Sequence, residues 1–201
     1  MMRTRQLFPF LLLALSCTGF ATGSPWVLEK DEDHIQLYTR SVAGSPFIAV
    51  KVTTTINAPI EKVASAFGDG NGCSQWRAMC KSSEVLSTVS DTERYVYLVL
   101  DLPWPLSDRD MVIHSVARVD PQSRTATVQL ESASTMYPAG DYVRAESEGS
   151  YQITALSNEQ VEFTYIMHAD LGGDLSPDVI NPRMASSTYE DVKRLRLLAE
   201  K

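Results

Sequence analysis

From residue 84 onward, hydrophobic and polar residues alternate along the chain with a period of two. This period is typical of strands that bury one face of a sheet. Short turns containing Pro, Ser, Asn or Asp separate most of the alternating segments, so we expect neighbouring strands to pair antiparallel. The pattern predicts strands at Glu84–Val89, Arg94–Asp101, Met111–Asp120, Thr125–Ser134, Tyr142–Ala155 and Gln160–Asp170.

The segments before and after this region complete a mixed pattern. Strands are predicted over Trp26–Lys30, Ile35–Thr39 and Phe47–Ile56, and a helix over Pro59–Phe67, where apolar residues recur at helical spacing. The chain ends in an amphipathic helix over Ile180–Lys201. Many strands and one long C-terminal helix indicate an α+β domain. Because a twisted sheet of this length tends to curl, we expect the helix to lie across its concave face.

Small side chains occupy one face of several predicted strands. On one of them Met111, Ile113, Ser115 and Ala117 share a face, and two later strands repeat the mixture of small and apolar residues. Small residues that point inward leave room for an internal hydrophobic cavity. Tight packing of the sheet on the helix is the alternative, and the sequence leaves both open.

Positive charge followed by a short apolar run at the N-terminus indicates a signal peptide. Arg3 and Arg5 precede the run Leu7–Leu15, and small residues suited to cleavage follow it. The run is about half the length that spans a bilayer. We therefore expect residues 1–23 to be removed on export and residues 24–201 to form one domain.

Export would place the mature protein in the periplasm or outside the cell. The alternative is a lipoprotein anchored through Cys17, although Ala14 and Leu15 stand in the reverse of the usual order for such a cleavage site. The net charge of −7 disfavours nucleic-acid binding, and Lys and Arg form no cluster for anionic membranes. We expect a monomer whose membrane contact is brief and mainly hydrophobic.

The mature chain would keep an even pair of cysteines, Cys73 and Cys80. Such a pair in an exported protein is typical of a disulfide. On one straight helix their Cα atoms would lie about 10.5 Å apart, too far for a bridge. The bond therefore needs a bent segment, which Gly70 and Gly72 favour; two buried thiols are the alternative.

A stiff loop between two predicted strands carries the most informative motif. Pro103 and Pro105 flank Trp104 and interrupt strand pairing, and Arg109 and Asp110 close the loop. This motif resembles the START family of lipid-transfer domains. Further segments follow the order of that family: Trp26–Asp31, Ile35–Arg40, Trp76, Asp170–Pro177 and Asn181.

The resemblance implies a helix-grip fold, in which a long curved antiparallel sheet wraps around a C-terminal helix and encloses a hydrophobic cavity. It implies a lipid or other hydrophobic ligand, no catalysis and no cofactor, and leaves open whether the lipid is transferred. The loop between Asp101 and Arg109 and the start of the final helix would form the gate. Ser115 stands where a basic residue would be expected in sterol-binding members, so sterol specificity is not carried over.

Candidate site residues follow from the alternation and from the family together. The ligand-binding candidates are Trp104, Met111, Ile113, Ser115, Tyr165, Met167, Ile180 and Met184. Methionines suit flexible acyl chains, although stripes of this kind also occur in plain cores. Arg109, Asp110 and Asn181 are assigned structural roles. Because Arg109 and Asp110 are adjacent on a strand, they point to opposite faces and each needs its own partner.

The remaining chemistry is sparse. The three histidines, His34, His114 and His168, show no spacing typical of a metal site. No nucleophile elbow or phosphate-binding loop occurs. Two other functions stay open: a helix-grip enzyme of the aromatase/cyclase type, which needs an acid and a base in the cavity, and a protein-interaction module with a vestigial, filled cavity.

Overall fold

The computed structural model describes residues 24–67, 70–138 and 140–201. The predicted signal peptide 1–23, including Cys17, lies outside the described residues. The elements, in chain order, are β1 (Val27–Glu32), β2 (Ile35–Ser41), β3 (Ile48–Ile56), α1 (Ile60–Ala66), the short 3₁₀ helix η1 (Cys73–Gln75), β4 (Cys80–Ser90), β5 (Glu93–Leu100), β6 (Arg109–Asp120), β7 (Thr125–Ser132), η2 (Ser134–Met136), β8 (Val143–Arg144), β9 (Glu146–Ala155), β10 (Val161–Asp170) and α2 (Pro177–Ala199).

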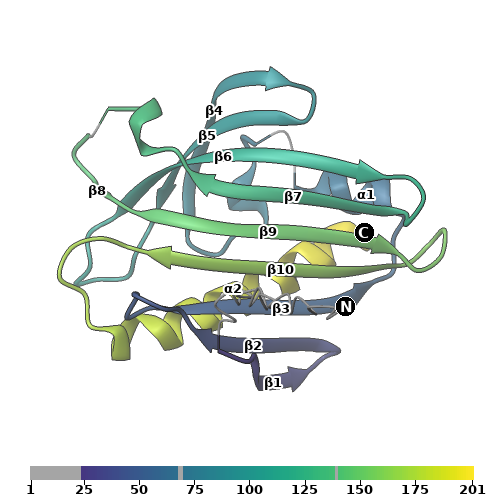
Figure 1. Ribbon diagram of the computed structural model, residues 1–201, viewed down its shortest axis with the longest axis horizontal. Coiled ribbons are helices and arrows are strands. Elements are labelled where there is room, and N and C mark those ends of the chain that lie inside the picture. Colours follow the sequence, from purple (N-terminus) through teal and green to yellow (C-terminus); the bar gives the residue numbers. More distant parts are fainter. Residues whose placement is uncertain (1–23, 68–69, 139) are drawn as a thin grey trace, which may run out of the picture.

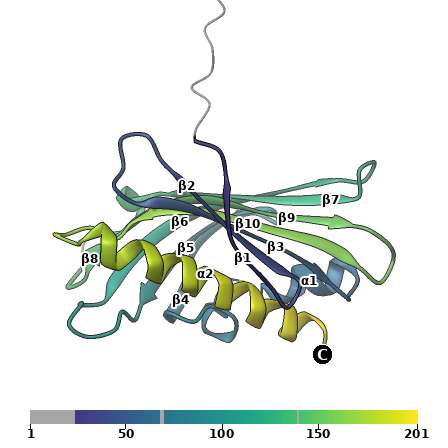
Figure 2. The same cartoon turned by 90° about the horizontal axis from the view of Figure 1, so that it is seen from below.

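Within the described residues, ten strands form one sheet in the order β1-β2-β3-β10-β9-β7-β6-β5-β4, with β8 beside β6 (Figure 1). Every pair is antiparallel except β6 with β8. Figure 2 shows α2 lying across one face of this sheet, with α1 on the same side. The predicted α+β, helix-grip architecture is confirmed.

The helix α2 presents one side to the sheet and uses its two halves differently. In its C-terminal half, Val192 and Leu195 pack in one apolar cluster with Phe163 of β10. In its N-terminal half, Ile180 and Met184 belong to a second cluster, built mainly from β5, β6 and the loops around them. Cavities lie around the second cluster and between the two clusters.

Several element boundaries differ from the prediction, among them those of the segment Tyr142–Ala155 and the start of α2. The strand expected over Tyr142–Ala155 is interrupted at Ala145, whose amide donates to the carbonyl oxygen of Asp110 at 2.8 Å. The interruption lets β8 pair with β6 while β9 pairs with β7 and β10. The helix α2 begins at Pro177 rather than Ile180, because a proline is well tolerated in the first turn of a helix.

The cysteine pair forms a disulfide. Cys73 opens η1 and Cys80 opens β4, and their Cα atoms are 5.9 Å apart. The chain between them is bent, as the expected bridge required. This short covalent loop carries Trp76 and Arg77, both of which line the cavity described next.

Candidate ligand cavity

An apolar cavity of about 340 Å³ lies between the inner face of the sheet, α1 and the disulfide loop. Its volume falls within the range of small-molecule sites, roughly 300–1,000 Å³. Small residues on the strands leave this space open, as the inward alternation predicted. We call it the main cavity, and its wall includes Phe67, Cys73, Trp76, Arg77, Val96, Leu98, Met111, Ile113, Ser115, Ala117, Val128, Leu130, Ser147, Gly149, Tyr151, Ile153, Tyr165 and Met167.

Gly149 on β9 shows how closely the backbone approaches at this wall. A Cβ atom added there would lie too close to the backbone of β10 at Ile166 and Met167. The position therefore admits no side chain without displacement of the neighbouring strand. The inward-facing glycine contributes backbone rather than a side chain to the wall, and this helps to keep the cavity open.

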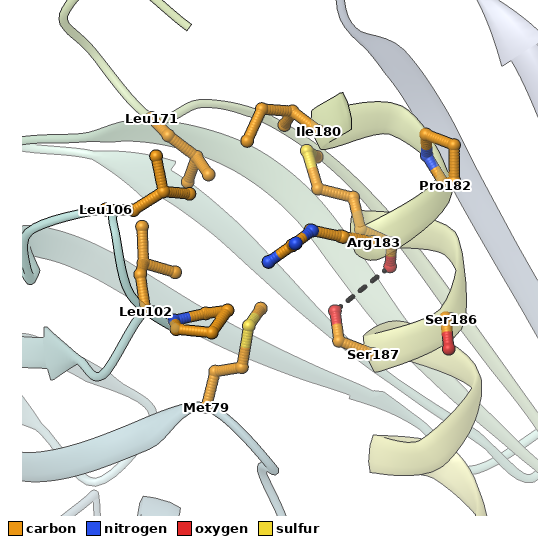
Figure 3. A pocket seen from close by; sticks show the side chains of 11 residues that line it. Met79, Leu102, Leu106, Leu171, Ile180, Pro182, Arg183, Ser186 and Ser187 are labelled. Atoms are coloured by element: carbon orange, nitrogen blue, oxygen red, sulfur yellow. Dashed lines mark hydrogen bonds between the residues drawn. The ribbon is translucent and has the colours of Figure 1, made fainter. Parts of the chain in front are cut away.

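A second space, which we call the groove, lies between the Asp101–Asp108 loop and the N-terminal half of α2 (Figure 3). Its volume is about 330 Å³. Leu102 and Leu106 face it from the loop side, and Ile180 and Met184 face it from α2. Ile180 and Met184 were expected among the ligand-binding residues, and the structure places them around this groove rather than on the wall of the main cavity.

A small space of about 50 Å³, which we call the neck, shares lining residues with both of the others. It shares Met111 and Met167 with the main cavity, and Met79 and Met184 with the groove. Four of the seven methionines of the chain therefore surround the neck. Methionine side chains are unbranched and adaptable, so they can close the neck or move aside.

A buried polar group stands at the neck. Arg77 lines both the main cavity and the neck, and its Nη2 donates to the hydroxyl of Tyr165 at 2.7 Å. Its Nε lies 3.7 Å from Oδ2 of Asp191 on α2. Oδ1 of Asp191 accepts a hydrogen bond of 2.6 Å from the amide of Ala78. Burial raises the pKa of the Asp191 carboxyl above its ordinary value, although Arg77 and the Ala78 amide act in the opposite direction.

Aromatic rings extend from this polar group along the cavity. Tyr165 stacks at a tilt on Tyr151, with 4.6 Å between ring centroids, and Tyr151 contacts Phe67 at 4.8 Å. Burial raises the pKa of both tyrosines, which keeps the hydroxyls protonated near neutral pH. The guanidinium of Arg77 also lies 5.4 Å from the ring of Trp76. The wall therefore combines a few charged side chains, Arg77 and Arg94 among them, with a largely aromatic and aliphatic surface.

Trp104 does not line any of these spaces. Its side chain is 90% exposed at the tip of the loop, whereas the neighbouring Leu102 and Leu106 face the groove. The flanking prolines restrict the loop so that its hydrophobic residues point to different sides. The structure therefore places Trp104 outside the ligand wall, in a position to contact an external surface.

Arg109 ties the loop to the segment that leads into α2. Its Nε donates to the carbonyl oxygen of Leu171 at 2.6 Å, its Nη1 binds the carbonyl oxygen and hydroxyl of Ser107, and its Nη2 donates to Gly172. The side chain of Arg109 is buried. These bonds link the two sides of the groove through one residue.

Asp110 points the other way and has its own partner. Arg144 of β8 contacts both of its carboxylate oxygens, at 2.7 and 3.1 Å, and the hydroxyl of Tyr97 adds a bond of 3.0 Å. Burial and the bond to Asp110 raise the pKa of Tyr97 to about 12. Asn181 accepts from the amide of Ile48 at 3.1 Å and so fixes α2 to the start of β3.

The sequence prediction missed Arg77, Met79 and Asp191. Asp191 gave the clearest signal, because it is the one charged residue on the buried, mainly apolar side of α2. Arg77 gave none, since it lies in a short segment without periodicity. In the part of the chain that the structure describes, no group of three or more metal-ligating side chains occurs, and no helix is long and apolar enough to cross a membrane.

Comparisons with known proteins agree with this architecture. A family model described as START domain matches residues 19–200. An uncharacterized protein of Pseudomonas aeruginosa is 28% identical over 185 residues, which cover 91% of each chain. The crystal structure of a STAR-related lipid transfer protein from Xanthomonas axonopodis is 30% identical, with a TM-score of 0.80, and the match covers 88% of this chain and 99% of that one.

A more distant similarity extends the comparison of the fold. The crystal structure of an aromatase/cyclase from Streptomyces sp. R1128 is 18% identical, with a TM-score of 0.51, and the match covers 76% of this chain and 93% of that one. At this identity the similarity concerns the fold alone.

Proposed function

Because the chain belongs to the START domain family, we propose that it binds one lipid or other hydrophobic small molecule in the main cavity and carries out no catalysis. The observation that carries the proposal is the cavity itself, which opens beside Met111 and Tyr165 where a vestigial interior would be filled. Burying a methylene contributes about 0.8 kcal/mol. A chain of about twelve methylenes therefore supplies ample binding energy without any charged contact.

The groove is the proposed entrance. The loop that carries Trp104 would contact a membrane first, since tryptophan is favoured at the boundary between lipid and water. The loop and the N-terminal half of α2 would then separate, and the bonds of Arg109 to Leu171 and Gly172 would have to open or move with them. A ligand entering here would pass the methionines of the neck and reach the main cavity.

The proposed location is the periplasm or the exterior of the cell. The disulfide between Cys73 and Cys80 supports a location outside the cytosol, because such bonds persist in oxidising compartments. Removal of residues 1–23 and a monomeric state are parts of the same proposal.

Native mass spectrometry of the protein exported from the full-length sequence tests binding directly. We expect one added mass per protein, which solvent extraction identifies as a lipid or another hydrophobic molecule. The mass of the polypeptide reports in the same spectrum whether residues 1–23 are removed and whether Cys17 carries lipid. A bare protein that also ignores a panel of labelled lipids contradicts the proposal, and a bound molecule that is chemically converted supports the aromatase/cyclase alternative.

The gate is tested by the variant Trp104→Ala. We expect the rate of lipid transfer between vesicles to fall severalfold while the thermal midpoint stays unchanged, because the Trp104 side chain is almost fully exposed. Leu156→Ala is the matched control, since Leu156 is an exposed hydrophobic residue in the turn between β9 and β10. Equal effects of the two variants on transfer would exclude a special role for the loop.

A further inference from the structure

Arg77 lies beside both the main cavity and the neck, and its hydrogen-bonding capacity is only partly used. The Arg77 side chain is 18% exposed and lines both the main cavity and the neck. Nη2 donates to Tyr165, and Nε lies 3.7 Å from Asp191. Among the described residues, Nη1 donates no hydrogen bond to the protein.

The other buried arginines show that this is unusual for the molecule. Arg109 uses Nε, Nη1 and Nη2 in bonds to the protein. Arg144 uses the same three nitrogens on Asp110 and on backbone carbonyl groups. Neither of these two lines the main cavity. Of Arg77, Arg109 and Arg144, the one with spare donors is therefore the one that lines the main cavity.

We propose that Arg77 is the head-group site and that the ligand is a chain amphiphile ending in an oxyanion, a carboxylate or a phosphate, with its chain in the main cavity. This inference rests on the proposed function. A guanidinium offers parallel N–H groups in a planar fork that matches the oxygens of a carboxylate or phosphate. An apolar ligand alone would cover the spare donors without satisfying them, at a cost in binding free energy.

The surroundings of Arg77 support an anion rather than a neutral hydroxyl. The separation of 3.7 Å from Asp191 is longer than a charge-assisted hydrogen bond, so this carboxylate compensates the cation only loosely. Asp191 is itself engaged by the Ala78 amide. The hydroxyl of Tyr165, which accepts from Arg77, holds the guanidinium beside a residue of the main cavity wall.

The experiment compares three twelve-carbon ligands that differ only at the head: dodecanoate, dodecyl phosphate and dodecan-1-ol. Each displaces Nile red, a neutral dye, from the exported protein at pH 7.5. We expect at least one of the two anions to bind about tenfold or more tightly than the alcohol, the size of one charge-assisted hydrogen bond. The preferred anion identifies the head as carboxylate or phosphate.

In the variant Arg77→Gln, we expect this preference to disappear through a loss of affinity for the anion, while retained binding of Nile red and an unchanged thermal midpoint show that the variant is folded. Arg118→Gln is the matched control, because Arg118 is an exposed arginine of β6 that lines neither the main cavity nor the neck. A preference that survives in Arg77→Gln overturns the inference. A preference removed instead by Arg183→Gln, in the groove, or by Arg94→Gln, on the cavity wall, also overturns it.

Because Arg77→Gln leaves Asp191 without its cation, Asp191→Asn provides a second measurement that keeps Arg77 in place. We expect Asp191→Asn to bind the preferred anion more tightly than the wild type, since it removes the competing carboxylate. A purely structural Arg77–Asp191 pair predicts weaker binding instead, which would contradict the inference. If the wild type takes up neither Nile red nor any of the three ligands, the proposed function itself fails.

Discussion

Two buried Arg–Asp pairs of the described structure differ in how many of the arginine's hydrogen-bond donors are paired within the protein. Asp110 receives two bonds from Arg144 and one from Tyr97, and Arg144 also binds the carbonyl oxygens of Ser134 and Tyr137. At the neck, Arg77 and Asp191 approach to 3.7 Å. The first pair is a closed network, and the second has donors to spare.

The difference follows from what each pair faces. Arg144 and Asp110 hold β8 and the preceding loop against the start of β6, and neither residue lines the main cavity, the groove or the neck. Arg77 and Asp191 stand where the main cavity meets the neck. A buried charge that is fully hydrogen-bonded stabilises one structure, whereas a charge with spare donors beside a cavity is available to a ligand.

The largest expected effect comes from breaking the closed network. Asp110→Asn removes the negative charge but keeps the shape, so it leaves Arg144 buried without a counter-charge. We expect the free energy of unfolding to fall by about 3–5 kcal/mol, as measured by urea denaturation. Asp108→Asn is the control, because the Lys81–Asp108 pair is partly exposed and contributes little. Similar losses of stability in the two variants would mean that the buried Asp110 network contributes no more than a partly exposed ion pair.

An intermediate effect is expected from the disulfide that positions the second pair. Replacing both Cys73 and Cys80 by Ser opens an eight-residue loop, and the chain-entropy model gives a loss of about 2–3 kcal/mol. The same loop carries Arg77, so the double variant should also lose part of its preference for the anionic ligand. Reducing agent added to the wild type should reproduce both changes, and it should leave the double variant unaffected. A double variant that keeps full stability would show that packing alone holds the loop.

The smallest effect is expected from Asp191→Asn at neutral pH, at most about 1–2 kcal/mol, because its partner faces a cavity and retains Tyr165. The pH dependence sharpens the comparison. Burial raises the pKa of Asp191 in the folded protein above 3.8, so its stabilising contribution is present below that value and is lost as the pH rises through the folded-state pKa.

The stability of the wild type relative to Asp191→Asn should therefore be greatest at acidic pH and decline as the pH rises. Urea denaturation of both proteins across this range measures the difference. A relative stability that increases with pH would mean that Arg77 holds Asp191 as a firmly paired carboxylate. The Arg77–Asp191 pair would then be as firmly paired as Arg144 and Asp110.

Local features of the sequence predicted much of the fold. Alternation located the long strands, and the disulfide followed from two nearby cysteines, Cys73 and Cys80. The inward positions of Met111 and Ser115 followed from the period of a strand, and the structure places both on the cavity wall. Their predicted contact with a ligand stays a prediction.

Long-range partners could not be predicted in the same way. Arg144 contacts Asp110 because the strand is interrupted at Ala145, which allows β8 to pair in parallel with β6. Arg77 and Asp191 are 114 positions apart in the sequence. They come into contact only because α2 packs across the sheet. The division into main cavity, neck and groove depends on the same packing. For this reason Ile180 and Met184 were expected beside the ligand chain and instead line the groove.

The four methionines around the neck bear on which ligands the protein can distinguish. A wall of unbranched, polarizable side chains adjusts its cross-section to whatever passes through it. It therefore tolerates saturated, bent or branched chains with little difference in free energy. If the proposed function holds, chain selectivity would be weak in such a passage, and discrimination between ligands would fall to the polar end of the molecule and to the length that the main cavity accepts.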